Sequence, residues 1–150
     1  MNARLYDEAI AQSKSTLEIK RGFAPAHSLL AACYTFKGMY PEAYREFGAA
    51  GIPSGDPFLG YLYAITGKKK EALRAIETLK RTAEHEYVDP YNTAILYLGL
   101  GDKNGAFASL EQAYAERSAS MPQMKMEPWF DPLRSDPRFQ DLLRRMNLPP

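Results

Sequence analysis

Cysteine and tryptophan are almost absent from this chain of 150 residues, which has one of each, Cys33 and Trp129. A single cysteine excludes an internal disulfide framework, and its place on an apolar helical face predicts a buried, small hydrophobic side chain. The two histidines, His27 and His85, lie far apart on different predicted helices and lack the spacing of metal ligands. We therefore expect no metal site and no cofactor.

The chain also has no excess of charge of either sign, since 19 basic residues are balanced by 18 acidic ones. Such a balance gives no overall attraction to nucleic acid or to an anionic membrane, and we expect neither as a partner. The chain contains no apolar run of transmembrane length and no leader-like segment at its start. The sequence does not identify the cellular compartment. The cytoplasm is favoured, and the periplasm is the alternative if a parent chain has an upstream membrane span.

Catalytic signatures are missing as well. The chain has no GxSxG motif, no P-loop and no dinucleotide fingerprint, and no acid, base or nucleophile pair stands out, so we expect a protein that is not an enzyme. Lys68, Lys69 and Lys70 open a predicted helix and are interpreted as a solvated turn. Four C-terminal arginines are interleaved with aspartates and predict surface ion pairs rather than a nucleic-acid site. These arginines are Arg134, Arg138, Arg144 and Arg145.

A repeated spacing is the strongest positive signal. Three times, a glycine follows a tyrosine by four residues and an alanine follows that glycine by five. The copies are Tyr34, Gly38 and Ala43; Tyr63, Gly67 and Ala72; and Tyr97, Gly101 and Ala106. Ala72 and Ala106 are 34 residues apart, as are Ala9 and Ala43, whereas Ala43 and Ala72 are 29 apart.

Each residue type in this spacing has a physical reason. The tyrosine lies late in a first helix and fills the space between that helix and its pair. The glycine ends the helix, because a left-handed backbone conformation causes little steric strain only in a residue without a Cβ atom. The alanine lies one turn into the second helix, where two backbones approach too closely for a larger side chain. The pattern therefore predicts pairs of packed helices.

The period and the order of these residues resemble the tetratricopeptide repeat (TPR) over residues 4–117, with one half repeat and three full repeats. The resemblance implies an all-α fold, a right-handed α-solenoid of antiparallel helix pairs with a C-terminal capping helix. We expect a repeat array over 1–117, followed in the same domain by a linker and capping helix over 118–150. The large aromatic residue usual early in each first helix is absent, because His27, Asp56 and Pro90 occupy that position.

The apolar periodicity and the cap signals predict helices over 4–20, 25–37, 57–66 and 90–101, with partner helices after Gly38, Gly67 and Gly101. The early glycines near residue 50 predict a short second helix. Residues 118–128 fit no period and are interpreted as a linker that lies against the array, with Met121, Met124 and Met126 filling irregular gaps. Trp129 and Phe130 are expected to anchor the chain before a last helix that Asp136 caps.

The tail from Trp129 to Phe139 looks like the end of C-terminal TPR regions found in large bacterial signalling proteins, which use them for protein contacts. This resemblance implies a non-catalytic module of a larger bacterial regulator that binds a peptide or protein segment on the concave face. Tyrosines there would give a large contact area, or Tyr61 and Tyr91 would merely pack against each other. The positions expected to line this groove are Ser28, Thr35, Pro57, Tyr61, Tyr91, Asn92 and Ile95.

The alternative is a structural or self-association role without a peptide ligand. The helix at 4–20 has the register of a second helix, but no first helix precedes it in this sequence. Its leftover apolar face is expected to include some of Leu5, Tyr6, Ile10 and Leu17. An apolar patch of this kind rarely stays in water, so residues 5–17 are expected to support a weak homodimer.

Overall fold

The computed structural model describes residues 3–148, and every regular element within them is helical. This confirms the all-α class predicted from the sequence. In chain order the helices are α1 (Ala3–Ile19), α2 (Ala24–Phe36), α3 (Tyr40–Ala49), α4 (Pro57–Ile65), α5 (Lys69–Ala83), α6 (Pro90–Gly99), α7 (Lys103–Ala115), the two 3₁₀ helices η1 (Met121–Lys125) and η2 (Pro128–Leu133), and α8 (Pro137–Arg145).

The helices begin where the sequence signals place them, because the predicted caps form. The Asp56 carboxylate accepts hydrogen bonds from the backbone amides of Phe58 and Leu59, at 2.9 and 3.0 Å, and so caps α4. Asp89 and Asp136 cap α6 and α8 in the same way, and a proline follows each of the three aspartates in the first turn. These side chains satisfy amide groups that a helix start would otherwise leave unpaired.

The tyrosine–glycine spacing produces the same helix end three times. Each glycine has a positive φ, 71° at Gly38, 81° at Gly67 and 74° at Gly101. In each copy the residue after the glycine donates its amide to the tyrosine carbonyl, which is the longer bond of a Schellman cap. These bonds run from Met39 to Tyr34 at 2.9 Å, from Lys68 to Tyr63 at 2.8 Å, and from Asp102 to Tyr97 at 3.0 Å.

The alanine of each copy lies one turn into the next helix and has no exposed surface. Ala43, Ala72 and Ala106 are all 0 % exposed. Each donates its amide to the residue that precedes its helix, at 3.0 to 3.1 Å. The sequence spacing therefore corresponds to one local geometry, which occurs in α2–α3, α4–α5 and α6–α7.

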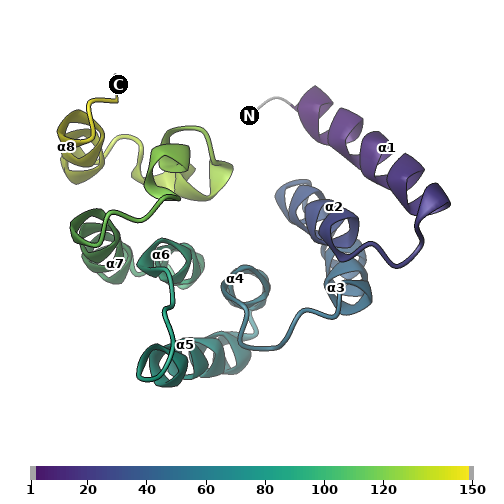
Figure 1. Cartoon of the computed structure of the whole chain (residues 1–150), viewed down its shortest axis with the longest axis horizontal. Helices are drawn as coiled ribbons and strands as arrows, with labels where there is room; N and C mark the ends of the chain where they lie inside the picture. The colour runs from purple at the N-terminus through teal and green to yellow at the C-terminus, as the bar shows by residue number, and fades with distance from the viewer. Residues whose placement is uncertain (1–2, 149–150) are drawn as a thin grey trace. The chain divides into compact units, whose positions relative to one another are not determined.

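The chain divides into two compact units, Met1–Ser54 and Gly55–Pro150, which we call unit 1 and unit 2. Unit 1 contains α1 to α3, and unit 2 contains the elements from α4 to α8 (Figure 1). The division falls in the loop after α3. As the early glycines predicted, α3 is short, with 10 residues against 15 in α5.

In unit 1, α2 packs against both α1 and α3. The α1 contact includes stacked rings of Tyr6 and Phe36, whose centroids are 5.7 Å apart, and an ion pair between Lys37 and Asp7. Cys33 is 4 % exposed, which confirms the buried small side chain predicted from the sequence. Burial raises the pKa of its thiol, so the reactive thiolate is disfavoured.

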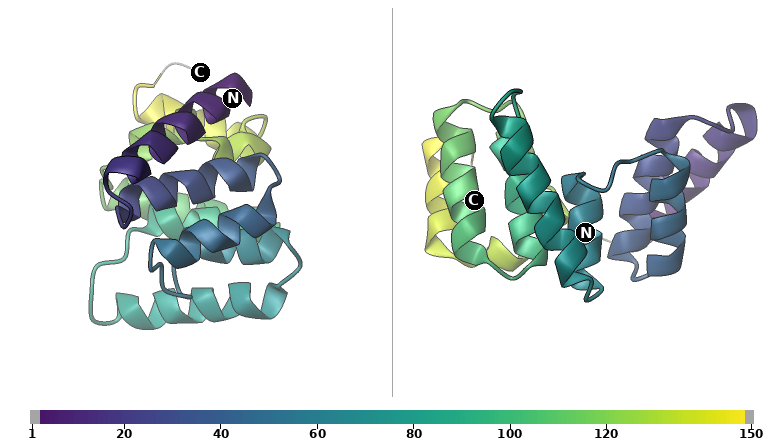
Figure 2. Two further views of the ribbon diagram at one scale, coloured as in Figure 1. Left: turned by 90° about the vertical axis from the view of Figure 1, so that its right-hand side faces the viewer. Right: turned by 90° about the horizontal axis from the view of Figure 1, so that it is seen from below.

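In unit 2, α4 packs against α5 and α6, and α6 packs against α7. Gly60 permits the close approach in α4, since a Cβ there would lie 2.8 Å from Leu96 Cδ1 and 3.1 Å from Ala75 Cβ. The last helix, α8, lies beside α7 (Figure 2, right). Its arginines form the predicted surface ion pairs, such as Arg145 with Asp141 at 2.9 Å.

The segment between α7 and α8 is more regular than predicted. Met121 and Met124 are buried, as expected, but Met126 is 76 % exposed, so the prediction that it fills a gap was wrong. The reason is the 3₁₀ geometry of η1, in which residues three apart share a face. Met121 and Met124 satisfy that spacing, and Met126 does not. Trp129 and Phe130, 5 % and 0 % exposed, anchor the chain as predicted.

Replacing Ala72 with leucine tests the close contact in unit 2. Ala72 is 0 % exposed and belongs to a core cluster with Ala75, Ile76 and Leu96, so added methylene groups would have to displace packed neighbours. We expect Ala72→Leu to lower the free energy of unfolding by about 1–3 kcal/mol. Urea unfolding followed by Trp129 fluorescence measures the change.

The control for this variant is Glu77→Leu, which adds the same side chain at an exposed position of α5. It should change the free energy of unfolding by less than about 0.5 kcal/mol. Equal effects of the two variants would mean that α5 does not meet its neighbours at Ala72.

Candidate functional site

The predicted groove residues differ widely in exposure. Ser28, Pro57, Tyr61 and Asn92 are half-buried. Thr35, Tyr91 and Ile95 are buried, at 4 %, 2 % and 0 % exposed. The prediction that these last three face an open groove was therefore wrong. For Thr35 the cause is local, since its hydroxyl points back along α2 and donates to the Ala31 carbonyl at 2.7 Å.

In unit 2 the expected groove face is covered by η2 of the same chain. The Trp129 ring packs against Phe58, with centroids 5.4 Å apart, and edge-on against Tyr61 at 4.9 Å. Phe130 packs against Tyr91 at 5.1 Å. Both groove tyrosines thus have aromatic partners in the tail. The sequence identified Trp129 and Phe130 as anchors but gave no sign of the surface to which they bind.

Polar contacts hold this tail against the start of α6. The Asp89 carboxylate accepts a hydrogen bond from the Tyr91 amide at 3.0 Å and from the hydroxyls of Ser118 and Ser120 at 2.7 and 2.8 Å. The Tyr91 hydroxyl donates to Glu127 Oε2 at 2.7 Å. Burial and this bond raise the pKa of Tyr91, so the ring stays neutral and remains a donor.

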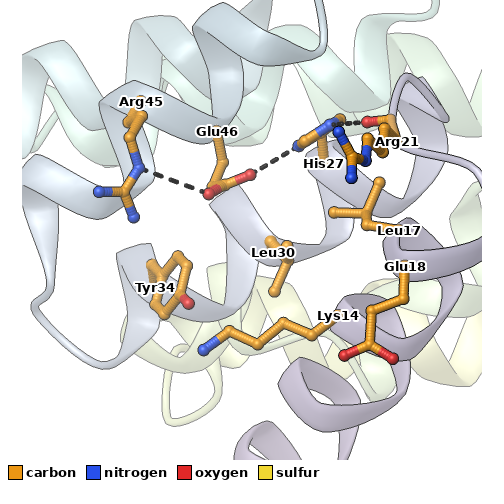
Figure 3. A pocket seen from close by; sticks show the side chains of 9 residues that line it. All are labelled: Lys14, Leu17, Glu18, Arg21, His27, Leu30, Tyr34, Arg45 and Glu46. Carbon is orange, nitrogen blue, oxygen red and sulfur yellow. Dashed lines mark hydrogen bonds and ion pairs between the residues drawn. The ribbon is translucent and has the colours of Figure 1, made fainter.

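A pocket in unit 1 was not anticipated. It has a volume of about 550 Å³ and is bordered by α1, by the turn after it, by α2 and by α3 (Figure 3). Its lining residues are Lys14, Leu17, Glu18, Arg21, His27, Leu30, Tyr34, Arg45 and Glu46. Of these residues only His27 stood out in the sequence as a departure from an expected pattern, and nothing in the sequence joined it to the other lining residues.

His27 joins two walls of this pocket. Its Nδ1 lies 2.6 Å from Glu46 Oε2, and its Nε2 lies 2.9 Å from the Arg21 carbonyl oxygen. Both partners accept hydrogen bonds, so the geometry fits the imidazolium ion, which donates from both nitrogens. The bond to Glu46, and then the bond to Arg21, raise the pKa of His27 above its ordinary value of 6.5. His27 therefore fixes the α1–α2 turn to α3.

The charges around the pocket are only partly paired. Glu46 contacts His27 and lies 3.7 Å from the Arg45 guanidinium, so its charge is compensated within the site. Within residues 5–148, whose side chains the structure describes, Lys14, Arg21 and Glu18 form no ion pair. In the view of Figure 3, Lys14 extends toward Tyr34 and Arg21 lies near His27. Two cationic groups thus remain available for a ligand.

Other kinds of site find no support in the part of the chain that the structure describes. Over residues 3–148 there is no group of three or more histidine, cysteine, aspartate or glutamate side chains placed to hold a metal ion. Within the same residues no helix combines the length and apolar character needed to cross a bilayer. No protein-family model, no curated protein and no solved structure matches this chain.

Removing the Asp89 carboxylate should release the tail from α6. Asp89→Ala deletes a helix cap and two hydroxyl bonds, so we expect the free energy of unfolding of unit 2 to fall by about 2–4 kcal/mol. Asp102→Ala is the matched control, because Asp102 caps α7 through one bond, to the Gly105 amide at 2.8 Å. That variant should cost about 1 kcal/mol. Equal losses would mean that the serine bonds add nothing.

The His27 contacts predict that unit 1 becomes less stable as the pH rises. The pKa of His27 is higher in the folded chain, so its contribution is complete below about pH 6.5 and is lost as the pH passes through the folded pKa. Urea midpoints from α2 amide NMR signals in the full chain, from about pH 5 to about pH 8, measure this.

Two variants control the pH experiment. His27→Gln should remove the decline, because glutamine does not titrate in this range. His85→Gln changes an exposed histidine of unit 2 and should leave the decline intact. If the urea midpoint of His27→Gln still fell as the pH rose, a group other than His27 would be responsible for the pH dependence.

Proposed function

We propose that this chain is a protein-interaction module built from TPR-like helix pairs, arranged as a right-handed solenoid of antiparallel pairs with α8 as its cap. The support is the threefold repetition of one local geometry: a tyrosine carbonyl closed by a Schellman cap, followed by a fully buried alanine. The resemblance of the tail supports a place within a larger bacterial regulator. In this proposal the chain has no catalytic step and no cofactor.

The proposed activity is to bind a peptide segment of a partner protein in the unit 1 pocket. The observation that carries this is the pocket itself, about 550 Å³ with leucine and tyrosine walls and unpaired charged groups at its rim. This volume lies in the range of about 300–1,000 Å³ found for ligand sites. The concave face of unit 2 is a weaker candidate, because η2 already covers Tyr61 and Tyr91.

Other residues of α2, which do not line the pocket, remain candidates for a separate contact. Leu29 is 48 % exposed, and its neighbour Ser28, one of the predicted groove residues, is half-buried. Tyrosine and leucine anchors supply binding energy, and a serine supplies an adaptable hydrogen bond. In unit 2, Pro57 and Asn92 remain half-buried and stay candidates for a second contact.

Self-association through α1 remains the alternative. Leu5 is 53 % exposed, which favours it. Tyr6, however, stacks on Phe36, and Ile10 and Leu17 are half-buried, so Leu5 is the one exposed residue of the four that the sequence offered for this face. Sedimentation of the wild type and of Leu5→Glu separates the two roles, since a dimer that the charge abolishes would support association through α1.

Selection from a random-peptide display library tests the peptide-binding role. The full chain should enrich a family of related peptides. Leu17→Trp should lose them, because the larger ring occupies the pocket from the α1 side, and His27→Trp provides a second block from α2. Leu73→Trp on α5 of unit 2 is the control, since Leu73 is 45 % exposed and distant in sequence from the pocket.

Circular dichroism confirms that each variant is folded before its binding is compared. Enriched peptides that bind the two pocket variants as well as the wild type would place the site elsewhere. If no peptide family is enriched by the folded wild type, the peptide-binding role is wrong.

A further inference from the structure

We infer that the unit 1 pocket selects a segment in which an acidic side chain stands beside an aliphatic one. This rests on the proposed function and adds the chemistry of the ligand. The reason is the arrangement of charge: the pocket has three basic side chains, Lys14, Arg21 and Arg45, whereas one of its two carboxylates, that of Glu46, is already bound to His27.

The cationic groups that would meet the ligand come from α1, which carries Lys14, and from the turn after it, which carries Arg21. Lys14 and Arg21 are exposed and form no ion pair within the residues whose side chains are described. Charge-assisted hydrogen bonds from lysine and arginine to a carboxylate are stronger than neutral ones. The acidic group of a bound segment would therefore bind at the rim, beside Lys14 near Tyr34 or beside Arg21 near His27, rather than at the floor.

Tyr34 supplies a further donor inside the pocket. Its ring is 5 % exposed, and its hydroxyl makes no hydrogen bond with the described residues. The described side chains contain no fully buried polar atom without a partner, so solvent reaches this hydroxyl. A ligand that excludes solvent from this hydroxyl needs to place a polar atom near it. A carboxylate oxygen can accept the hydrogen bond that the Tyr34 hydroxyl donates.

The apolar part of the pocket lining is the reason why the bound segment should carry an aliphatic side chain beside its acidic one. Leu17 and Leu30 form the part of the pocket between the charged rim residues in Figure 3, and Leu30 is 2 % exposed. A small, fully hydrated anion would leave this surface wet, whereas a leucine- or valine-like side chain would cover it.

Charge also argues against more highly charged ligands. Glu18 remains unpaired at the rim and would repel a phosphate dianion more strongly than a single carboxylate. The chain as a whole has a net charge of +1, so its overall charge gives little attraction to a polyanion. A segment with one acidic residue fits this balance.

The test uses synthetic copies of the peptides that the wild-type chain enriches. We expect them to share an aspartate or glutamate next to an aliphatic residue. Replacing that acid by its amide, Asp→Asn or Glu→Gln, should weaken binding about tenfold, as expected for loss of a charge-assisted hydrogen bond. Fluorescence polarisation of the labelled peptide with the full chain measures the dissociation constant.

Protein variants test the same contact from the other side. Lys14→Gln with Arg21→Gln should weaken binding of the acidic peptide about tenfold and that of the amide peptide little. Glu18→Gln should strengthen binding of the acidic peptide about two- to fivefold, because it removes a repelling charge. Lys69→Gln with Arg74→Gln is the matched control: it removes the same two charges from exposed positions of α5 and should leave affinity unchanged.

Ionic strength provides an independent readout. Raising it from about 0.01 M to about 0.15 M shortens the Debye length from about 30 Å to about 8 Å, so binding of the acidic peptide should weaken while that of its amide analogue changes little. Enriched peptides without an acidic residue, or equal affinities for acid and amide, would overturn this inference while leaving peptide binding intact. Failure to enrich any peptide would overturn both proposals.

Discussion

The left-handed glycine after each tyrosine-bearing helix is the constraint on which the other contacts depend. At Gly38, Gly67 and Gly101 the backbone reverses within three residues, after which the next helix starts. That short turn brings the start of the second helix against the end of the first, so the alanine one turn later has no room for a larger side chain. Tyrosine packing, alanine burial and the pairing of helices all follow from the same few backbone angles.

In unit 2, burial and binding compete for one surface. The face of α4 and α6 that could receive a foreign peptide holds Trp129 and Phe130 of the chain itself. Two buried aromatic side chains are worth several kcal/mol, a large share of the stability of a domain of this size. A ligand that displaced these side chains would have to compensate for the lost packing free energy before it bound with net affinity. Unit 1 presents no such competition at its pocket, because its lining is already partly open to solvent.

Features encoded over a few residues could be read from the sequence, whereas those that join distant segments could not. The helix caps formed by Asp56 and Asp89 and the turns at the three glycines involve residues no more than four positions away, so the helix ends were predictable. Tyr91 packs against a tail more than 30 residues later, and periodicity does not report where such a tail packs. The pocket likewise needs three helices at once. Only one of its lining residues, His27, stood out in the sequence.

The tail that closes unit 2 also fixes where this protein can be divided. By repeat spacing alone, a boundary after residue 117 would look natural, since the last tyrosine, glycine and alanine all precede it. A fragment cut there would lose Trp129, Phe130 and the hydroxyls that bind Asp89, and would leave Tyr61 and Tyr91 facing water. Such a fragment would adsorb apolar peptides without discrimination. This non-specific binding would result from the truncation and could be mistaken for the peptide recognition expected of a helical repeat protein.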